Sequence, residues 1–328
     1  MRLLILGGTE FVGRAVADEA LARGWEVTVF HRGKHAPPPG VGVLHGDRTD
    51  SATLAPLEKG EWDAVVDTWA GAASAVRDAA RALSGRVGHY VYVSSRSVHP
   101  FPVAAGTAED GPVVDASPDA GDVAYPEDKR GGELAALAEF GDRALLGRAG
   151  LILGPGENLG RLPWWLGRVA RGGPVLAPGP RELPLQYIDV RDLAQWLLDA
   201  ARAGLGGAYN LVSRPGHATM GDLLEACVRV TGSGAELRWT DPETVLAAGI
   251  EPWTELPVWT PPGEMHAAMH GGDVTKVHAA GLRCRPVADT VADTWAWLRE
   301  RGGTAPHRPD RPPVGLSPEK EAAVLRQI

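Results

Sequence analysis

A glycine-rich segment near the N-terminus constrains the fold more than any other feature of the sequence. It follows the apolar run Leu3–Leu6 and precedes an apolar stripe with helical spacing. Glycines at such a point allow a tight turn and a close approach of the backbone to a phosphate, while the first turn of the helix offers unpaired N–H groups. We therefore predict a strand–turn–helix unit that binds the pyrophosphate of a dinucleotide, with an ordinary turn as the alternative. The residues assigned to this site are Gly7, Thr9, Glu10, Phe11, Val12 and Gly13.

Apolar runs and helical patterns alternate in the sequence up to residue 150. Strands are expected near residues 27–30, 43–44, 64–66, 90–93 and 144–146, and helices up to residue 83 and over residues 131–140. Such alternation is typical of a parallel sheet with helices on both faces. The sequence therefore predicts an α/β fold with a doubly wound parallel sheet, the Rossmann architecture.

The pattern changes after residue 151, where prolines interrupt it and tryptophans become frequent. We infer a smaller, discontinuous second domain, and a pocket between two such domains is a common ligand site. The expected division is a dinucleotide-binding domain at 1–150 and 185–213, a substrate-binding domain at 151–184 and 214–275, a helical closure at 276–303, and a tail with a short helix at 304–328.

The end of the second expected strand bears on the choice of cofactor. A NAD-selective site usually has an acid here for the ribose 2′-hydroxyl, but this chain has Arg32 and no acid. A guanidinium pairs well with a 2′-phosphate, so we predict NADP(H) as the preferred cofactor, with NAD(H) also possible. The alternative is that Arg32 and Lys34 are solvated loop charges. Glu10 occupies the position of the usual middle glycine, and its carboxylate is expected to point away from the phosphates.

Tyr125 and Lys129 stand four residues apart near the start of an expected helix, a spacing that puts both side chains on one face. An ammonium near a phenol favours the phenolate and lowers the Tyr pKa toward the working pH of a general acid–base catalyst. Ser95 ends the fifth expected strand, at the edge where ligands bind in this architecture. A packing tyrosine with a surface lysine is the alternative interpretation of the pair.

These residues together resemble the extended or atypical short-chain dehydrogenase/reductase superfamily, also described as the NAD-dependent epimerase/dehydratase family. The matching segments are Gly7–Gly13, Gly46–Asp50, Tyr90–Ser95, Tyr125–Lys129, Gly154–Gly156, Tyr187–Asp192 and Asp273–Lys276. The resemblance implies that Ser95, Tyr125 and Lys129 form the catalytic triad and that Lys129 also holds the nicotinamide ribose. It further implies that Asp47 contacts the adenine, with Arg48 beside it in the cofactor site. A homodimer is a further expectation from the resemblance.

The family's special substrate residues are missing from this chain. Leu151 and Leu185 stand where nucleotide-sugar epimerases carry an Asn and an Arg for the sugar diphosphate, and Arg96-Ser97 replaces the Asp-Glu pair of dehydratases. We therefore predict an NADP(H)-dependent carbonyl reductase or dehydrogenase acting on a small molecule. The alternatives are an epimerase of a sugar or sugar nucleotide and a non-catalytic NADP-binding regulator.

The composition of the chain limits the classes of partner that the protein is expected to bind. The formal net charge of −8 and the absence of a basic stripe argue against nucleic acid and membranes as partners. Two cysteines do not form a disulfide framework, and a cytoplasmic location is expected. His266 and His270 have the spacing of metal ligands on a helix, but no third ligand is evident, so no metal is predicted.

Overall fold

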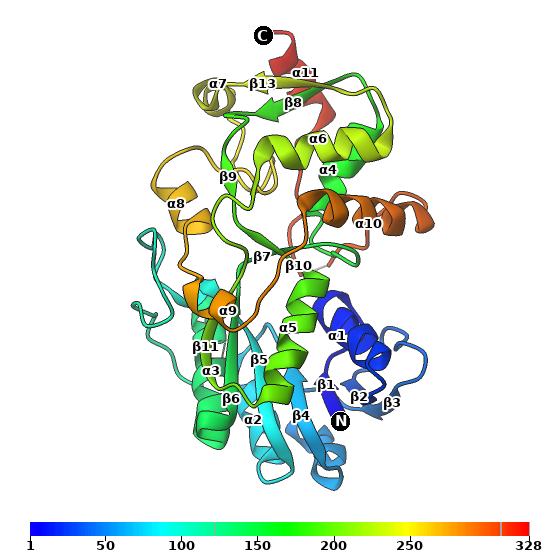
Figure 1. Cartoon of the computed structure of the whole chain (residues 1–328), viewed down its shortest axis with the longest axis vertical. Coiled ribbons are helices and arrows are strands. Elements are labelled where there is room, and N and C mark those ends of the chain that lie inside the picture. Colours follow the sequence, from blue (N-terminus) through cyan, green and yellow to red (C-terminus); the bar gives the residue numbers. More distant parts are fainter. Residues whose placement is uncertain (122, 309, 328) are drawn as a thin grey trace.

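A seven-stranded parallel sheet dominates the lower part of the molecule (Figure 1) in the computed structural model, which describes residues 1–121, 123–308 and 310–327. The strand order is β11-β6-β5-β4-β1-β2-β3, and every pairing in this sheet is parallel. The predicted doubly wound α/β fold is therefore confirmed. The sheet strands are β1 (Arg2–Leu6), β2 (Glu26–His31), β3 (Gly42–His45), β4 (Trp62–Asp67), β5 (Val87–Ser95), β6 (Ala144–Ala149) and β11 (Gly207–Leu211).

Helices cover both faces of this sheet. On one face, α1 (Phe11–Ala22) and α5 (Val190–Ala203) share a core with the apolar side chains of the strands. On the other face, α2 (Ala73–Leu83) and α3 (Tyr125–Phe140) share a second core. Burial of apolar area on both faces explains why the strand sequences are almost continuously apolar.

The helix expected over residues 131–140 begins earlier, at Tyr125. The adjacent glycines at 131 and 132 favour a later start because glycine weakens helices. In the structure these glycines allow close packing. A Cβ on Gly131 would lie 2.5 Å from the Ser117 carbonyl oxygen, and one on Gly132 would lie 2.5 Å from the Tyr92 hydroxyl. The helix that carries Tyr125 therefore approaches the sheet more closely than bulkier residues permit.

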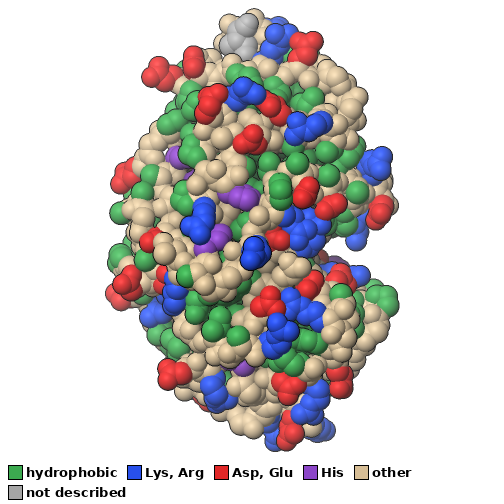
Figure 2. Space-filling model, viewed as in Figure 1, with side chains coloured by type: hydrophobic (Ala, Val, Ile, Leu, Met, Phe, Trp, Pro, Cys, Tyr) green, Lys and Arg blue, Asp and Glu red, His purple; other side chains and the backbone are tan. Residues whose placement is uncertain are grey.

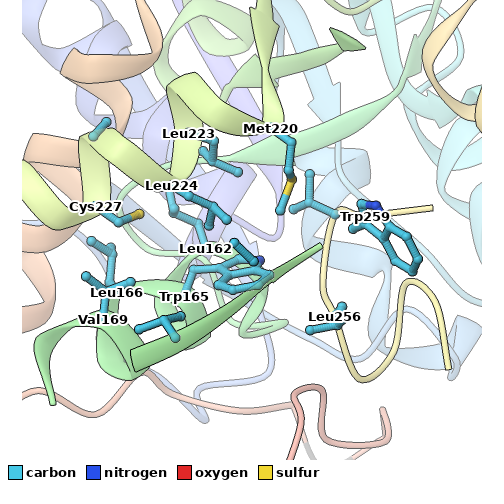
Figure 3. Packing of buried hydrophobic residues seen from close by; sticks show 14 of the residues in the cluster. Leu162, Trp165, Leu166, Val169, Met220, Leu223, Leu224, Cys227, Leu256 and Trp259 are labelled. Carbon is cyan, nitrogen blue, oxygen red and sulfur yellow. The ribbon is translucent and has the colours of Figure 1, made fainter. Parts of the chain in front are cut away.

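The upper part of the molecule has its own apolar core. Trp165 and Trp259 are fully buried in it, together with leucines of α4 and α6 and with Leu256 (Figure 3). The Trp165 indole N–H donates to the Pro257 carbonyl over 2.7 Å, so this tryptophan belongs to the core. The helices here are α4 (Arg161–Ala170), α6 (Met220–Thr231), α7 (Pro242–Ala247), α8 (Glu264–His270), α10 (Val287–Glu300) and α11 (Pro318–Leu325). The short helix α9 (Thr275–Ala279) lies instead beside β11 of the seven-stranded sheet, and its Val277 belongs to the core beneath α1 and α5 (Figure 1). The short strands are β7 (Leu151–Leu153), β8 (Pro174–Pro178), β9 (Pro184–Leu185), β10 (Tyr187–Asp189), β12 (Ala218–Thr219) and β13 (Glu236–Thr240).

The C-terminal tail is anchored to this upper part. The Ser317 hydroxyl accepts from the Lys320 N–H and caps α11. Glu321 is buried, and its carboxylate pairs with Arg168 of α4 over 2.5 Å.

The surface is hollowed on the right between the upper and lower parts, with Lys and Arg side chains at the rim (Figure 2). Among the described helices, none has the length and apolar character needed to span a membrane.

Candidate active site

The glycine turn between β1 and α1 has the backbone that a pyrophosphate site needs. Gly7 and Gly8 have φ values of +114° and +90°, a region that L-residues with a Cβ avoid. A Cβ on Gly13 would lie 2.6 Å from the Gly8 backbone nitrogen, so α1 packs directly on the turn. The N-terminus of α1 receives no capping hydrogen bond from the side chain before it. These residues therefore fit a dinucleotide, whose phosphates would meet free N–H groups.

Glu10 is the residue before α1, and its backbone is extended. One of its carboxylate oxygens lies 3.7 Å from Nε2 of His35, and both side chains are about half exposed. Its charge also acts on Arg308 of the C-terminal tail. Glu10 therefore faces cationic or protonatable groups at the rim of the turn.

Arg32 is exposed and directly follows β2. Its charge and that of Lys34 act on Asp47, which follows β3. Hydrogen bonds from the Thr49 N–H and hydroxyl, at 3.0 and 2.8 Å, are the main reason that the pKa of Asp47 is lowered. The structure thus brings Arg32 and Asp47 together beside the turn.

Arg48 does not join them, because its side chain is buried in the sheet. Its guanidinium pairs with Asp67 at the end of β4 and donates to the Ala75 carbonyl over 2.9 Å. The Tyr90 hydroxyl donates to the same Asp67 carboxylate over 2.6 Å. The guanidinium is therefore engaged inside the protein, and a contact of Arg48 with the cofactor stays a prediction. The Arg48 guanidinium also lies 5.3 Å from the ring centroid of Trp69, a residue that was not singled out from the sequence.

Tyr125 and Ser95 meet at the carboxyl edge of the sheet. Tyr125 opens α3 and Ser95 ends β5, and the Ser95 hydroxyl lies close enough to the Tyr125 phenol to favour the charged form of the phenol. The Ser95 hydroxyl also donates to that of Ser97 over 3.1 Å. Burial raises the pKa of Tyr125, whereas the Ser95 hydroxyl and three arginines oppose that rise. Both groups are placed to exchange a proton with one substrate oxygen.

Lys129 lies one helical turn beyond Tyr125 and is buried. Its ammonium donates to the Trp69 carbonyl and, over 2.7 Å, to the Val93 carbonyl. It lies 6.0 Å from the Tyr125 ring centroid. Burial lowers the pKa of Lys129 to about 7, against the attraction of Asp67 and Glu133. The ammonium expected to favour the Tyr125 phenolate therefore fixes α3 to β4 and β5.

The arginines that do act on Tyr125 are Arg311, Arg161 and Arg308. The guanidinium of Arg311 lies 5.5 Å from the Tyr125 ring centroid. None of these three arginines was predicted as a site residue from the sequence. Arg161 comes shortly after the Gly154–Gly156 segment, which was a usable signal, but the two tail arginines lie in a stretch expected to be irregular.

A buried ionic cluster joins α3 to β5 and β6 next to Ser95 and Tyr125. Glu133 of α3 is inaccessible to solvent and accepts from Arg148 of β6 over 2.9 and 3.0 Å. It also accepts from the Ser94 hydroxyl over 2.7 Å and from Arg130 over 2.8 Å. Ser94 precedes Ser95, so the cluster ties the serine strand to the tyrosine helix.

The remaining candidate positions lie apart from Tyr125. Leu151 and Leu185 are buried in the upper apolar core. Arg96 turns toward the end of α8, where it donates to Gln186 Oε1 over 3.1 Å and to the Met269 carbonyl over 3.2 Å. The rings of His266 and His270 lie 4.7 Å apart, and burial lowers the pKa of His270 to about 3. Within the described ranges, no cluster of three or more His, Cys, Asp or Glu side chains could hold a metal ion.

Comparison with known proteins agrees with this geometry. Residues 3–84 match the model of the NAD dependent epimerase/dehydratase family. No curated protein matches the chain. Among solved structures, a putative epimerase from Burkholderia cenocepacia is 20% identical, with 91% of this chain and 98% of that chain covered and a TM-score of 0.69.

Two further structures carry a dinucleotide. The Bordetella bronchiseptica enzyme WbmH in complex with NAD+ is 19% identical, with 92% and 99% of the two chains covered and a TM-score of 0.66. The UDP-glucose 4-epimerase of Thermus thermophilus in complex with NAD is 20% identical, with 91% and 99% covered and a TM-score of 0.65. At these identities the likeness establishes the fold. The resemblance to the NAD dependent epimerase/dehydratase family is thereby confirmed over residues 3–84, and the similar structures confirm the fold over most of the chain.

Proposed function

We propose that this protein is a nicotinamide-dependent epimerase of a sugar or sugar nucleotide, with Tyr125 as its general acid and base. The observation that carries the proposal is the pair of hydroxyl groups of Ser95 and Tyr125, which lie together at the carboxyl edge of the sheet, where β5 ends and α3 begins. The similar structures include a UDP-glucose 4-epimerase and a UDP-glucuronic acid 4-epimerase, so the comparisons favour epimerisation over the carbonyl reduction expected from the sequence.

The chemistry follows from the positions of these groups. A nicotinamide held at the glycine turn would supply the hydride acceptor and donor for a carbinol carbon of the substrate. As a phenolate, the Tyr125 oxygen would accept the proton of the substrate hydroxyl while the carbinol carbon loses its hydride. The resulting phenol would return the proton when the carbonyl is reduced from its other face. Ser95 hydrogen-bonds the same oxygen and orients it. Lys129 fixes the start of α3 through its two backbone carbonyl contacts and remains close to the site of the nicotinamide ribose.

The dinucleotide is proposed to lie across the turn at Gly7–Gly13, with its adenosine toward Asp47. We propose further that the sheet-bearing part of the chain holds the dinucleotide. The upper part, at 151–184 and 214–275, then contributes the substrate side of the cleft. NAD(H) is the cofactor in the similar complexes. Arg32 supports the acceptance of NADP(H) as well.

Conversion of UDP-glucose and UDP-glucuronic acid tests the proposed reaction. Each is incubated with the protein and a small amount of NAD+ or NADP+, the sugars are separated by chromatography, and absorbance at 340 nm is followed. Epimerisation gives a second sugar isomer with no steady growth of reduced cofactor. A steady, stoichiometric change in reduced cofactor would contradict it.

Carbonyl reduction is the second candidate. It is favoured by Leu151 and Leu185, which are buried and apolar at the two places where the resemblance calls for diphosphate-binding side chains. In this case, a panel of ketones and aldehydes gives net oxidation of NADPH and no interconversion of sugar isomers.

Replacement of Arg32 tests the cofactor assignment. Arg32→Ala is expected to weaken NADP+ binding by roughly tenfold or more, since a charge-assisted pair with the 2′-phosphate is lost, while NAD+ binding changes little. Calorimetric titration with both dinucleotides measures the effect. Arg86→Ala, at an exposed residue before β5, is the matched control. Equal losses for the two cofactors would remove Arg32 from the 2′-phosphate site.

A further inference from the structure

The three arginines beside Tyr125 come from two distant parts of the chain. Arg161 is the first residue of α4, whereas Arg308 and Arg311 belong to the C-terminal tail. Each acts electrostatically on Tyr125, and Arg161 and Arg311 also act on one another. Neither the glycine turn nor the Ser95–Tyr125 pair needs three positive charges at this place, so the cluster calls for its own explanation.

The Arg161 guanidinium has no direct ionic contact. It lies 5.3 Å from the Trp253 ring centroid, and in the described part of the chain it forms no hydrogen bond or ion pair. Burial lowers the pKa of Arg161 and the positive charge of Arg311 adds to this, while the attraction of Glu157 and Tyr125 opposes it only in part. A desolvated cation beside a like charge is unfavourable unless an anion joins it.

The acidic groups nearby do not neutralise the cluster. Asp310 accepts from Arg308 over 3.0 and 2.6 Å, and it lies 3.9 Å from Arg311. The buried Glu157 carboxylate accepts from the backbone N–H groups of Arg161 and Leu162, and burial raises its pKa to about 7. Glu10 acts on Arg308 as well, and it lies 3.7 Å from His35. Asp310 and Glu10 thus serve the two tail arginines, and no carboxylate of the described residues forms an ion pair with Arg161.

The tail arginines are held in place rather than carried on a free end. The Arg308 N–H donates to the Asn158 carbonyl over 3.2 Å, and the Gly315 N–H donates to the Thr254 carbonyl over 2.7 Å. Leu316 is buried in the upper core, and the Arg168–Glu321 pair fixes the helix that follows. The fold therefore presents Arg308 and Arg311 to Tyr125 from a segment anchored on both sides, which is the preorganisation that a binding site requires.

We propose that Arg161, Arg308 and Arg311 bind an oxyanion of the substrate, a carboxylate or phosphate attached close to the carbon that reacts at Tyr125. This inference rests on the proposed function, since it makes Tyr125 the reacting group. Arginine suits such a ligand because its planar fork matches both anions and stays charged at all working pH values. Leu151 of β7 and Leu185 of β9 are apolar and cannot bind a charged group. The tail arginines would therefore recognise the charge of the substrate in their place.

Anion binding is measured directly by calorimetry on the full-length protein saturated with NAD+, so that the glycine turn is occupied. The probes are inorganic phosphate, D-glucuronate and neutral D-glucose. Saturable binding of phosphate or glucuronate, with none of glucose, is expected, and the stronger of the two identifies the kind of anion. Arg311→Gln and Arg161→Gln are each expected to weaken that binding roughly tenfold to hundredfold. Arg311→Lys is expected to recover part of it, because the charge remains without the fork.

Arg301→Gln is the matched control. Arg301 stacks on Trp297 at 5.3 Å, much as Arg311 stacks on Tyr125, but it follows α10, away from the cluster. Thermal melting of each variant confirms that it is folded. The inference is overturned if neither anion binds the wild-type protein saturably, or if the Arg311 and Arg161 variants bind it as well as Arg301→Gln does. Anion binding that survives in an enzyme whose Tyr125→Phe variant remains fully active would uphold the site and refute the proposed function.

Discussion

Tyr125→Phe is expected to abolish isomer interconversion while leaving dinucleotide binding almost unchanged. The substitution removes only the hydroxyl that exchanges the proton, and general acid–base groups contribute roughly a hundredfold to a ten-thousandfold in rate. The ring stays, so the contacts with Arg311 and the start of α3 are kept. Steady-state kinetics with the substrate found by the isomer assay, together with calorimetric titration of NAD+, measures the two effects separately.

Tyr209→Phe provides the comparison. Tyr209 is a buried tyrosine of β11 whose ring centroid lies 5.0 Å from that of Trp196. Both rings belong to the core between the sheet and the helices α1 and α5. Its loss of a hydroxyl should leave the rate within a small factor of wild type. Turnover by Tyr125→Phe at a comparable level would mean that another group moves the proton.

Glu133→Ala is expected to lower the free energy of unfolding by about 3–5 kcal/mol, because Arg148 would remain buried without its counter-charge. Arg148 is only 3% exposed and donates both of its carboxylate hydrogen bonds to Glu133. Activity should fall as well, since the Ser94–Glu133 bond that links β5 to α3 is lost. Urea unfolding followed by tryptophan fluorescence gives the stability, and the isomer assay gives the activity.

Glu139→Ala on the same helix is the control for helix propensity and net charge. Glu139 is partly exposed and lies 3.6 Å from Arg81, so its removal should change stability by less than about 1 kcal/mol. Should Glu133→Ala fail to fold, Glu133→Gln keeps the shape and part of the hydrogen bonding, and an intermediate loss is expected. Equal effects of the Glu133 and Glu139 substitutions would show that the buried cluster does not support the edge.

Much of the sheet was predictable because its strands are buried on both faces and therefore appear as apolar runs. The glycine turn was predictable for a related reason, since positive φ angles and close backbone contacts admit few other residues. The start of α3 was predictable only from the spacing of Tyr125 and Lys129. Gly131 and Gly132 weaken the helical pattern at the point where close packing requires them. The burial of Arg48 was also hidden, since its partner Asp67 lies on another strand.

The substrate side was the least predictable part of the site. Arg161 and Arg311 are 150 positions apart in the sequence numbering, and no local spacing announces that they meet. A stretch rich in proline and arginine has no periodicity, so its place over Tyr125 depends on long-range contacts such as the Arg168–Glu321 pair. The sequence predicts Lys129, one helical turn away, as the cation that acts on the Tyr125 phenol. In the structure the arginines take that role, and Lys129 donates to backbone carbonyls.

The anchored tail has a consequence for the order in which the proposed sites can be lost. Arg308 and Arg311 reach Tyr125 only while α11 is docked on α4, whereas the glycine turn is formed by the sheet-bearing part of the chain. Local opening of the tail would therefore remove the proposed anion site while the proposed dinucleotide site stays formed.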